Sequence, residues 1–185
     1  ISALVDHGYR GTTTLEVERR AGVSRGARIH HFANKAALLA GVAEHLYDQL
    51  SAFYDEAFGD VPQGASERER VRHGLHALWS VYQRPHYTAV LELNLAARTD
   101  VELRERLYTI ALRHRQLALA VARHYFPTLA EDQARSLIEL VHSAFLGMRL
   151  HGAAVGDPEN IEIVLAALEE SAVSQLARTR TPRTQ

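Results

Sequence analysis

The chain has 185 residues, 11 histidines and no cysteine, and its formal net charge is −1 at pH 7. Without cysteine it can form neither a disulfide nor a thiolate metal site, so a metal would depend on histidines and carboxylates. No apolar run reaches the roughly 18 to 20 residues of a membrane span, and no secretory signal opens the chain. We therefore expect a soluble, cytoplasmic protein with no membrane partner and no cofactor. Because the chain opens on Ile1 inside a helical pattern, we expect its first helix to be truncated.

The charges are unevenly distributed along the chain. Residues 1–38 hold six basic and three acidic residues, whereas the remainder holds 15 basic and 19 acidic residues. A basic segment joined to an acidic one is typical of a protein that contacts a polyanion at one end. The uneven charge therefore favours a nucleic-acid contact near the N-terminus.

The first predicted elements are short helices separated by tight turns. After the end of a first helix, Thr12 or Thr13 offers the hydroxyl that caps a helix over LEVERRA, and Gly22 suits the left-handed residue that ends it. Ser24 caps the next helix, SRGARIHH, and Asn34 starts another. The chain therefore stops and restarts its helix twice in quick succession.

Longer helices are predicted for the rest of the chain. Apolar residues recur at helical spacing in KAALLAGVAEHLYDQLSAFYDEAF, and the composition of the following VPQGAS indicates a linker. Pro158 suits the first turn of the last helix, which runs to about Arg178 and is followed by a frayed polar tail. Between the linker and that last helix, we expect helices over residues 66–84, 85–98, 101–125 and 131–155. With no strand predicted, the fold class is all-α.

Two short helices joined by a turn that contains glycine are typical of a helix-turn-helix, whose second helix enters the DNA major groove. SRGARIHH suits that second helix, since Ile29 and Phe32 can face inward while polar side chains face outward. The side chains available for the groove are Arg25, Arg28, His30 and His31. Helix starts offer free N–H groups to phosphates, here at Thr13, Ser24 and Asn34, with the charge of Lys35 beside the last.

Three stretches carry a resemblance to a known family. They are Gly8-Tyr9-x-x-Thr12-Thr13, Ala21-Gly22-Val23-Ser24-Arg25-Gly26 and His30-His31-Phe32-x-Asn34-Lys35-x-x-Leu38-Leu39. At this spacing, over about Val5 to Val42, the chain resembles the DNA-binding domain of the TetR (tetracycline repressor) family of bacterial transcription regulators. The resemblance implies a helix-turn-helix domain of three helices over residues 1–42 and a helical ligand-binding and dimerisation domain over residues 43–180.

The resemblance also implies a function. We expect a regulator, most often a repressor, that binds double-stranded DNA as a homodimer and is released when its helical body binds a small-molecule effector. A symmetric dimer presents two recognition helices about 34–36 Å apart, so its operator should be a near-palindrome. Phosphate contacts should make the affinity for DNA steeply salt-dependent.

The last two long helices support dimerisation independently. SLIELVHSAFLGMRLHGAAV and IEIVLAALEESAVSQLA are apolar over more of their circumference than a surface helix needs. Small residues that would allow close helix approach are Ala144, Gly147, Ala166 and Ala167. We therefore expect these helices to form the dimer interface, as the resemblance also implies.

Site residues follow from the resemblance position by position. Phosphate-positioning roles are implied for Thr13, Ser24 and Lys35. Contacts to bases or phosphates are implied for Arg25, Ala27, Arg28 and His30, and we expect at least one of His30 and His31 to contact DNA.

The chain departs from the family pattern at three positions. Glu18 replaces a small Ala, Arg28 replaces an apolar residue, and Ile29 replaces the Tyr that reaches a phosphate. Since the first two positions normally pack together, we hypothesise that Glu18 and Arg28 form an ion pair between the two helices. Arg28 would then brace the motif rather than read a base.

Further residues of the helical body are candidates for effector binding, although such side chains most often belong to a core. They are Trp79, Tyr82, Tyr87, Asn94, Phe145 and Met148. Asn94 is a polar residue within LELNLAA, where a buried amide would need partners. His73 with His76, and Glu139 with His142, have a spacing that can hold a metal, but satisfied or solvated histidines are commoner, so no metal is predicted.

Two alternatives remain open at this point. An all-α enzyme lacks support from any GxSxG, Gly-rich phosphate loop, HExxH or cysteine nucleophile, but acid–base pairs on distant helices cannot be read from sequence. A helical protein-interaction adaptor with a decayed DNA motif would account for Glu18, Arg28 and Ile29. Salt-sensitive binding to palindromic DNA discriminates against both.

Overall fold

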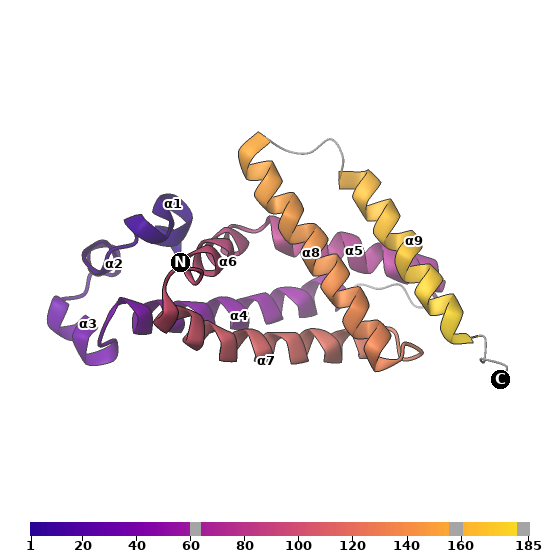
Figure 1. The fold of residues 1–185 in the computed structure, drawn as a ribbon, viewed down its shortest axis with the longest axis horizontal. Coiled ribbons are helices and arrows are strands. Elements are labelled where there is room, and N and C mark those ends of the chain that lie inside the picture. Colours follow the sequence, from indigo (N-terminus) through magenta and orange to yellow (C-terminus); the bar gives the residue numbers. More distant parts are fainter. Residues whose placement is uncertain (60–63, 156–160, 181–185) are drawn as a thin grey trace. The chain divides into compact units, whose positions relative to one another are not determined.

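The computed structural model describes residues 1–59, 64–155 and 161–180. Within these ranges the regular structure is entirely helical, so the all-α prediction is confirmed. The linker residues 61–63, Pro158 and the end of the polar tail lie outside the described residues. The helices are α1 Ser2–Gly11, α2 Thr14–Ala21, α3 Arg25–His31, α4 Lys35–Gly59, α5 Glu67–Gln83, α6 Pro85–Ala96, α7 Val101–Tyr125, α8 Glu131–Val155 and α9 Ile161–Arg180 (Figure 1).

The chain divides into two compact units. The first comprises residues 1–52 and 84–114, and the second comprises residues 53–83 and 115–185. The division falls inside α4 and α7, so α6 belongs to the same unit as the helix-turn-helix. The predicted boundary after residue 42 divides the chain by function rather than by compactness, and it stays a prediction.

Local side-chain bonds start the short helices at the predicted residues. The Thr13 hydroxyl accepts a hydrogen bond from the Glu16 amide at 3.1 Å, and the Ser24 hydroxyl accepts one from the Ala27 amide at 3.2 Å. Gly22 ends α2 in the left-handed conformation, with φ of 65°. Such caps satisfy amide groups that the first turn of a helix leaves unpaired. The two helices of the motif are thus bounded by the chain's own local chemistry.

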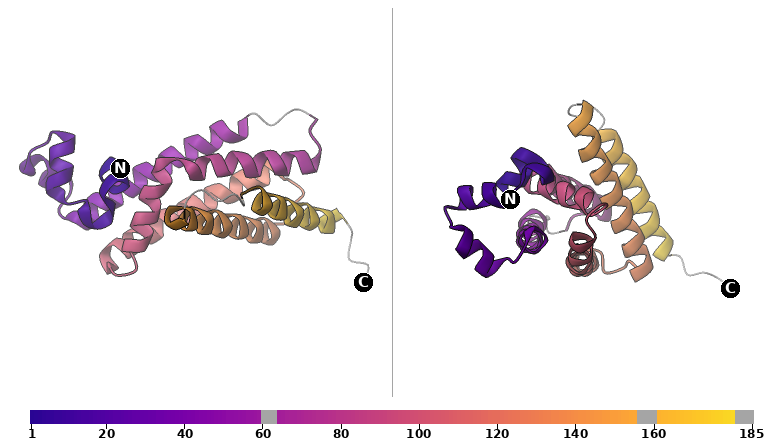
Figure 2. Two further views of the ribbon diagram at one scale, coloured as in Figure 1. Left: turned by 90° about the horizontal axis from the view of Figure 1, so that it is seen from above. Right: turned by 60° about the vertical axis from the view of Figure 1, so that its left-hand side comes forward.

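In the first unit, α1 packs on α6, as the two further views also show (Figure 2). Leu4 of α1 and Tyr87 of α6 are both buried, as are Leu39 and Leu46 on α4. Side chains at this spacing on α4 place one apolar stripe of the helix in the core. This core holds the unit that carries the DNA-binding motif.

In the second unit, α5 packs on α8 and α9, and α8 and α9 lie side by side in opposite directions (Figure 2). Phe145 of α8 lies in the core with Leu165 and Leu176 of α9. One carboxylate is also buried, because Glu169 accepts bonds from Arg68 at 2.6 Å and from Arg72 at 2.8 Å. These hydrogen bonds, that of Arg72 first, lower the pKa of Glu169, so the carboxylate stays ionised between α5 and α9.

Candidate nucleic-acid interface

The recognition helix α3 presents almost its whole surface to solvent. None of its seven residues is buried, and all except the half-buried Arg28 are exposed. The exposed side chains include the predicted DNA contacts Arg25, Ala27, His30 and His31. The rings of the two histidines meet edge to face, with centroids 5.2 Å apart. The helix therefore offers donors, apolar groups and one arginine to a groove-sized partner.

The hypothesised ion pair between the two helices of the motif is confirmed. Arg28 Nε lies 2.9 Å from Glu18 Oε1, and the two side chains are only 10% and 12% exposed. Arg28 Nη1 also donates to the Phe32 carbonyl at 3.2 Å. With its guanidinium bound on both sides, Arg28 braces α3 against α2. It is thus a positioning residue, and the implied base contact of Arg28 is withdrawn.

The prediction that Ile29 faces inward is wrong. Its side chain is 47% exposed, whereas Phe32, three residues on, packs against α4 so closely that a Cβ on Gly41 would lie 2.8 Å from its ring. The ion pair explains the difference, because the Arg28 side chain occupies the α2-facing side of α3. Ile29 is left on the flank of the helix.

The three phosphate-positioning candidates lie in two kinds of surroundings. Thr13 and Ser24 are exposed at the starts of α2 and α3, where each caps its helix. Lys35 is half-buried, and its ammonium donates to the Tyr9 carbonyl at 2.8 Å and lies 4.1 Å from the centre of the Tyr9 ring. Burial lowers the pKa of Lys35, and the charge of Asp100 acts in the opposite direction. The lysine is therefore held in place before any DNA arrives.

A kink at Gly8 brings α1 into contact with a carboxylate from far along the chain. Gly8 has φ of +63°, and a Cβ there would lie 2.9 Å from Glu92 Oε2. The same oxygen accepts the Tyr9 amide at 2.8 Å, and the Tyr9 hydroxyl donates to Asp100 at 2.7 Å. We call these residues, with Lys35, the Tyr9 clamp. It binds the end of α1 to α6 and to the start of α7, within the first unit.

The clamp shifts the titration of its own members. Burial, followed by the bond to Asp100, raises the pKa of Tyr9 to about 12. The Leu103 amide, followed by the Tyr9 hydroxyl, lowers the pKa of Asp100. The donor therefore stays protonated and the acceptor ionised around neutral pH, which is the charge-assisted form of the bond. Sequence analysis missed Glu92 and Asp100, because they lie 83 and 91 residues from their partner and no local pattern marks them.

A second cluster of charges joins α1 to α2. Arg20 bonds to Asp6 on α1 and to Glu16 on its own helix, each at 2.6 Å, and Arg19 also bonds to Glu16. The hydrogen bonds from Arg19 and then Arg20 lower the pKa of Glu16 to about 2. Part of the N-terminal positive charge is therefore neutralised by carboxylates of the same segment and does not face a partner.

Four of the effector candidates belong to the second unit. The Phe145 ring meets Trp79 and Tyr82 edge to face, with centroids 5.2 Å away in each case. The Tyr82 hydroxyl shares a hydrogen bond with Nδ1 of His142, and burial lowers the pKa of that histidine. Met148 is half-buried one turn after Phe145. These aromatic side chains pack on one another as a core does.

The other two effector candidates belong to the first unit. Tyr87 is buried on α6, but Asn94 on the same helix is exposed. The expectation that Asn94 is a buried amide in need of partners is therefore wrong. The reason is geometric, because successive residues of a helix point about 100° apart, so Asn94 lies beside the face that buries Leu93 rather than on it.

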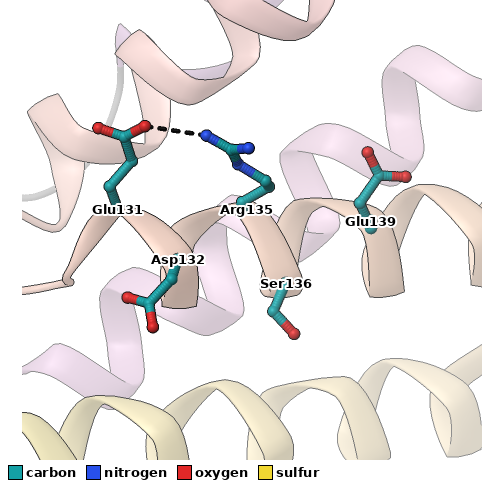
Figure 3. A pocket seen from close by; sticks show the side chains of 5 residues that line it. All are labelled: Glu131, Asp132, Arg135, Ser136 and Glu139. Carbon is teal, nitrogen blue, oxygen red and sulfur yellow. Dashed lines mark hydrogen bonds and ion pairs between the residues drawn. The ribbon is translucent and has the colours of Figure 1, made fainter.

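An open hollow lies along the first turns of α8. It is lined by Glu131, Asp132, Arg135, Ser136 and Glu139 (Figure 3). Arg135 neutralises Glu131 at 2.9 Å, and Arg115 neutralises Glu139 at 2.9 Å. The hollow is open to solvent, whereas small-molecule sites usually enclose most of their ligand. Among the described residues, no group of three or more metal-ligating side chains gathers, and Glu139 and His142 each bond elsewhere.

The similarity of this chain to known proteins agrees with the helix-turn-helix motif described above. A family model for bacterial regulatory proteins of the tetR family matches residues 2–42. The HTH-type transcriptional regulator CymR of Pseudomonas putida is 27% identical over 184 residues, which cover 96% of this chain and 87% of CymR. The HTH-type transcriptional repressor AcnR of Corynebacterium diphtheriae is 27% identical over 174 residues, which cover 90% of this chain and 83% of AcnR.

Solved structures share the fold. A transcriptional regulator from Rhodococcus sp. Rha1 aligns with a TM-score of 0.69 at 21% identity, over 98% of this chain and 94% of that one. A putative regulator from Streptomyces coelicolor A3(2) aligns with a TM-score of 0.68 at 23% identity, over 97% of this chain and 92% of that one. These relatives are regulators rather than enzymes, so the enzyme alternative is set aside. Along the described residues, no helix is both long and apolar enough to cross a membrane.

Proposed function

Since the chain belongs to the TetR family of bacterial regulatory proteins and is a DNA-binding transcription regulator, we propose that it is a repressor that a small-molecule effector releases from its operator. The operator is a near-palindrome of double-stranded DNA, bound by a homodimer in the bacterial cytoplasm. A relative that aligns over most of the chain bears the name of a repressor, which supports repression rather than activation.

The observation that carries the proposal is the exposed surface of α3. Arg25, Ala27, His30 and His31 are exposed on this helix, while Arg28 and Glu18 fix the helix against α2. Thr13, Ser24 and Lys35 supply hydrogen-bond donors and charge for the phosphates. Two of the three departures from the family pattern thus have a structural purpose, which removes the main argument for a decayed motif and an adaptor.

The helices α8 and α9 support the homodimer. Their outer faces expose Leu140, Leu150 and Ile163, the last at 67%. Between these lie the small residues Ala166, Ala167 and Gly147, and nothing lies within 4 Å of a Cβ built on that glycine. Small and apolar side chains on adjacent helices suit close packing against an identical pair across a two-fold axis.

Effector release requires two conformations of the dimer. An effector that prefers the conformation unsuited to DNA lowers the affinity for DNA by its differential binding and by no more. We propose that the effector binds near the aromatic side chains of Trp79, Tyr82 and Phe145, with Met148 as a further candidate in the same unit. Tyr87 and Asn94 are separate candidates in the first unit. Since a single residue, Arg84, separates α5 from α6 and α6 carries Glu92, the Tyr9 clamp is the element through which α6 acts on the motif.

Selection of randomised duplex DNA on the whole chain tests the proposed function. We expect recovery of a near-palindrome whose affinity falls steeply with salt, since each neutralised phosphate adds about 0.9 to the slope of log affinity against log salt. Arg25→Ala should abolish enrichment, whereas Arg113→Ala, which changes an exposed arginine that pairs with Glu44 on α4, should leave it unchanged. No enrichment from a folded dimer, with and without candidate effectors, would reject DNA recognition by this motif.

The homodimer is tested by sedimentation. Ile163→Glu should convert the dimer to monomer and weaken operator binding, because a charge cannot be buried unpaired in an apolar interface. Glu162→Gln, at the neighbouring exposed position, is the matched control and should leave the dimer intact. A dimer unaffected by Ile163→Glu would place the interface elsewhere.

A further inference from the structure

Ile29 is an apolar side chain in the middle of the recognition helix, and no core explains it. It is 47% exposed, and it follows Arg25 by one helical turn. Leaving a large aliphatic side chain in water forgoes the free energy of burial. In a helix that enters DNA, that burial becomes available when the complex forms.

The space beside Ile29 is open. Helical side chains lean toward the N-terminus, so the surface that Ile29 covers lies over the preceding turn, where Gly26 stands. A Cβ on Gly26 would meet only the Ser24 hydroxyl, at 3.8 Å. Among the residues that the structure describes, no other side chain lies within 4 Å of that Cβ, so a partner can approach this flank of Ile29 closely.

The charged side chain next to Ile29 does not compete with it for contact with DNA. Arg28, the neighbouring residue, is bound by Glu18 and by the Phe32 carbonyl. An isoleucine cannot replace it as a donor to phosphate, because its side chain has no polar hydrogen. What the major groove offers to an apolar side chain is the C5 methyl group of thymine, which marks that base and no other.

We infer that Ile29 is a specificity-determining residue that reads the C5 methyl group of a thymine in each operator half-site. The inference rests on the proposed function, and it specifies one base of the operator that the protein recognises. One turn of α3 is 5.4 Å and one base-pair step is 3.4 Å. The thymine therefore lies about one or two base pairs from the base that Arg25 contacts.

The test removes the methyl group without changing base pairing. In the operator selected on the whole chain, each thymine is replaced in turn by uracil, symmetrically in both half-sites, and the affinity is measured for the unaltered protein and for Ile29→Ala. One replacement per half-site should weaken binding of the unaltered protein about fourfold, the value of one buried methyl group. Ile29→Ala should bind the unaltered operator more weakly, and the same replacement should no longer affect it.

A matched variant separates methyl reading from general apolar contact. Leu15→Ala changes another exposed apolar side chain of the motif, on α2, and should keep the uracil profile of the unaltered protein. Thermal unfolding of each variant verifies that it is folded, as expected for exposed positions. If the profiles of Ile29→Ala and the unaltered protein coincide, the inference is overturned while the proposed function stands. If the unaltered protein selects no DNA, the proposed function fails and the inference with it.

Discussion

Both compact units have a buried apolar core, but the side-chain clusters that distinguish them differ in kind. In the first, directional polar bonds of the Tyr9 clamp, 2.7 to 2.8 Å long, join the end of α1 to Glu92 of α6, to Asp100 before α7 and to Lys35 of α4. In the second, the rings of Trp79, Tyr82 and Phe145 pack edge to face. Ring burial contributes several kcal/mol without a strict geometry, whereas a hydrogen bond contributes about 1 kcal/mol and sets a direction.

The difference between the two units indicates which of them an effector can shift. A motif whose orientation depends on a few bonds of about 1 kcal/mol each can be shifted by the differential affinity of an effector, typically about 1–3 kcal/mol. The ring cluster of the second unit contributes a larger burial energy and therefore more of the stability. We therefore expect variants of the second unit to affect stability most, and variants of the first unit to affect DNA binding out of proportion to stability.

The largest effect is expected from the ring cluster. Phe145→Ala should lower the free energy of unfolding by about 3–5 kcal/mol, because it removes a fully buried ring that contacts two others. Urea denaturation at one fixed protein concentration measures it. Tyr108→Ala, at a ring that is 65% exposed on α7, is the control and should change stability little. Equal effects at both positions would show that the second unit does not depend on its ring cluster.

The ion pair of the motif should give an intermediate effect. Glu18→Ala should cost about 2 kcal/mol, since it leaves the largely buried guanidinium of Arg28 without its carboxylate. The double variant Glu18→Ala with Arg28→Leu should recover much of this loss, because an apolar pair replaces the charged one. A double-mutant cycle in denaturant measures the coupling. Additive effects of the two substitutions would contradict a direct interaction.

The Tyr9 clamp should have a smaller effect on stability and a clear one on DNA. Tyr9→Phe removes the bond to Asp100 and should cost about 1 kcal/mol. Glu92→Gln keeps the shape of the acceptor of the Tyr9 amide but removes its charge. Both should change operator affinity by more than their change in stability predicts, when affinity is measured well below the melting temperature. Asp48→Asn, at an exposed residue of α4 in the same unit, is the control.

The smallest effect is a pH dependence in the second unit. Burial lowers the pKa of His142 from its ordinary value of 6.5. Below pH 6.5 the unfolded chain therefore binds the proton first, so the stability due to this group is complete above pH 6.5 and falls as the pH drops through the folded pKa. His142→Asn should flatten this part of the stability profile relative to the unaltered protein. His76→Asn, at an exposed histidine of α5, should not.

Features that depend on neighbouring residues were predictable from the sequence. The caps at Thr13 and Ser24 and the left-handed Gly22 lie where expected, because each forms bonds with residues only a few positions away. The pair of Glu18 and Arg28 was predictable for a different reason, since both residues depart from the pattern of a motif whose helix packing is fixed. When two positions that pack together both change, and the new side chains have opposite charges, the sequence alone predicts that the two side chains pair.

By itself, then, the sequence determined the helical order, the caps and the recognition motif, because those follow from periodicity and from bonds within a few residues. Tertiary structure alone decided that Ile29 and Asn94 face outward, and that Tyr9 meets Glu92 and Asp100 across 83 and 91 residues. Periodicity marks which residues share a helix face, but which face is covered depends on what packs against it. The packing partner of each face is fixed only when the whole chain folds. The entropy cost of closing such long loops is offset only by the contacts of the complete core.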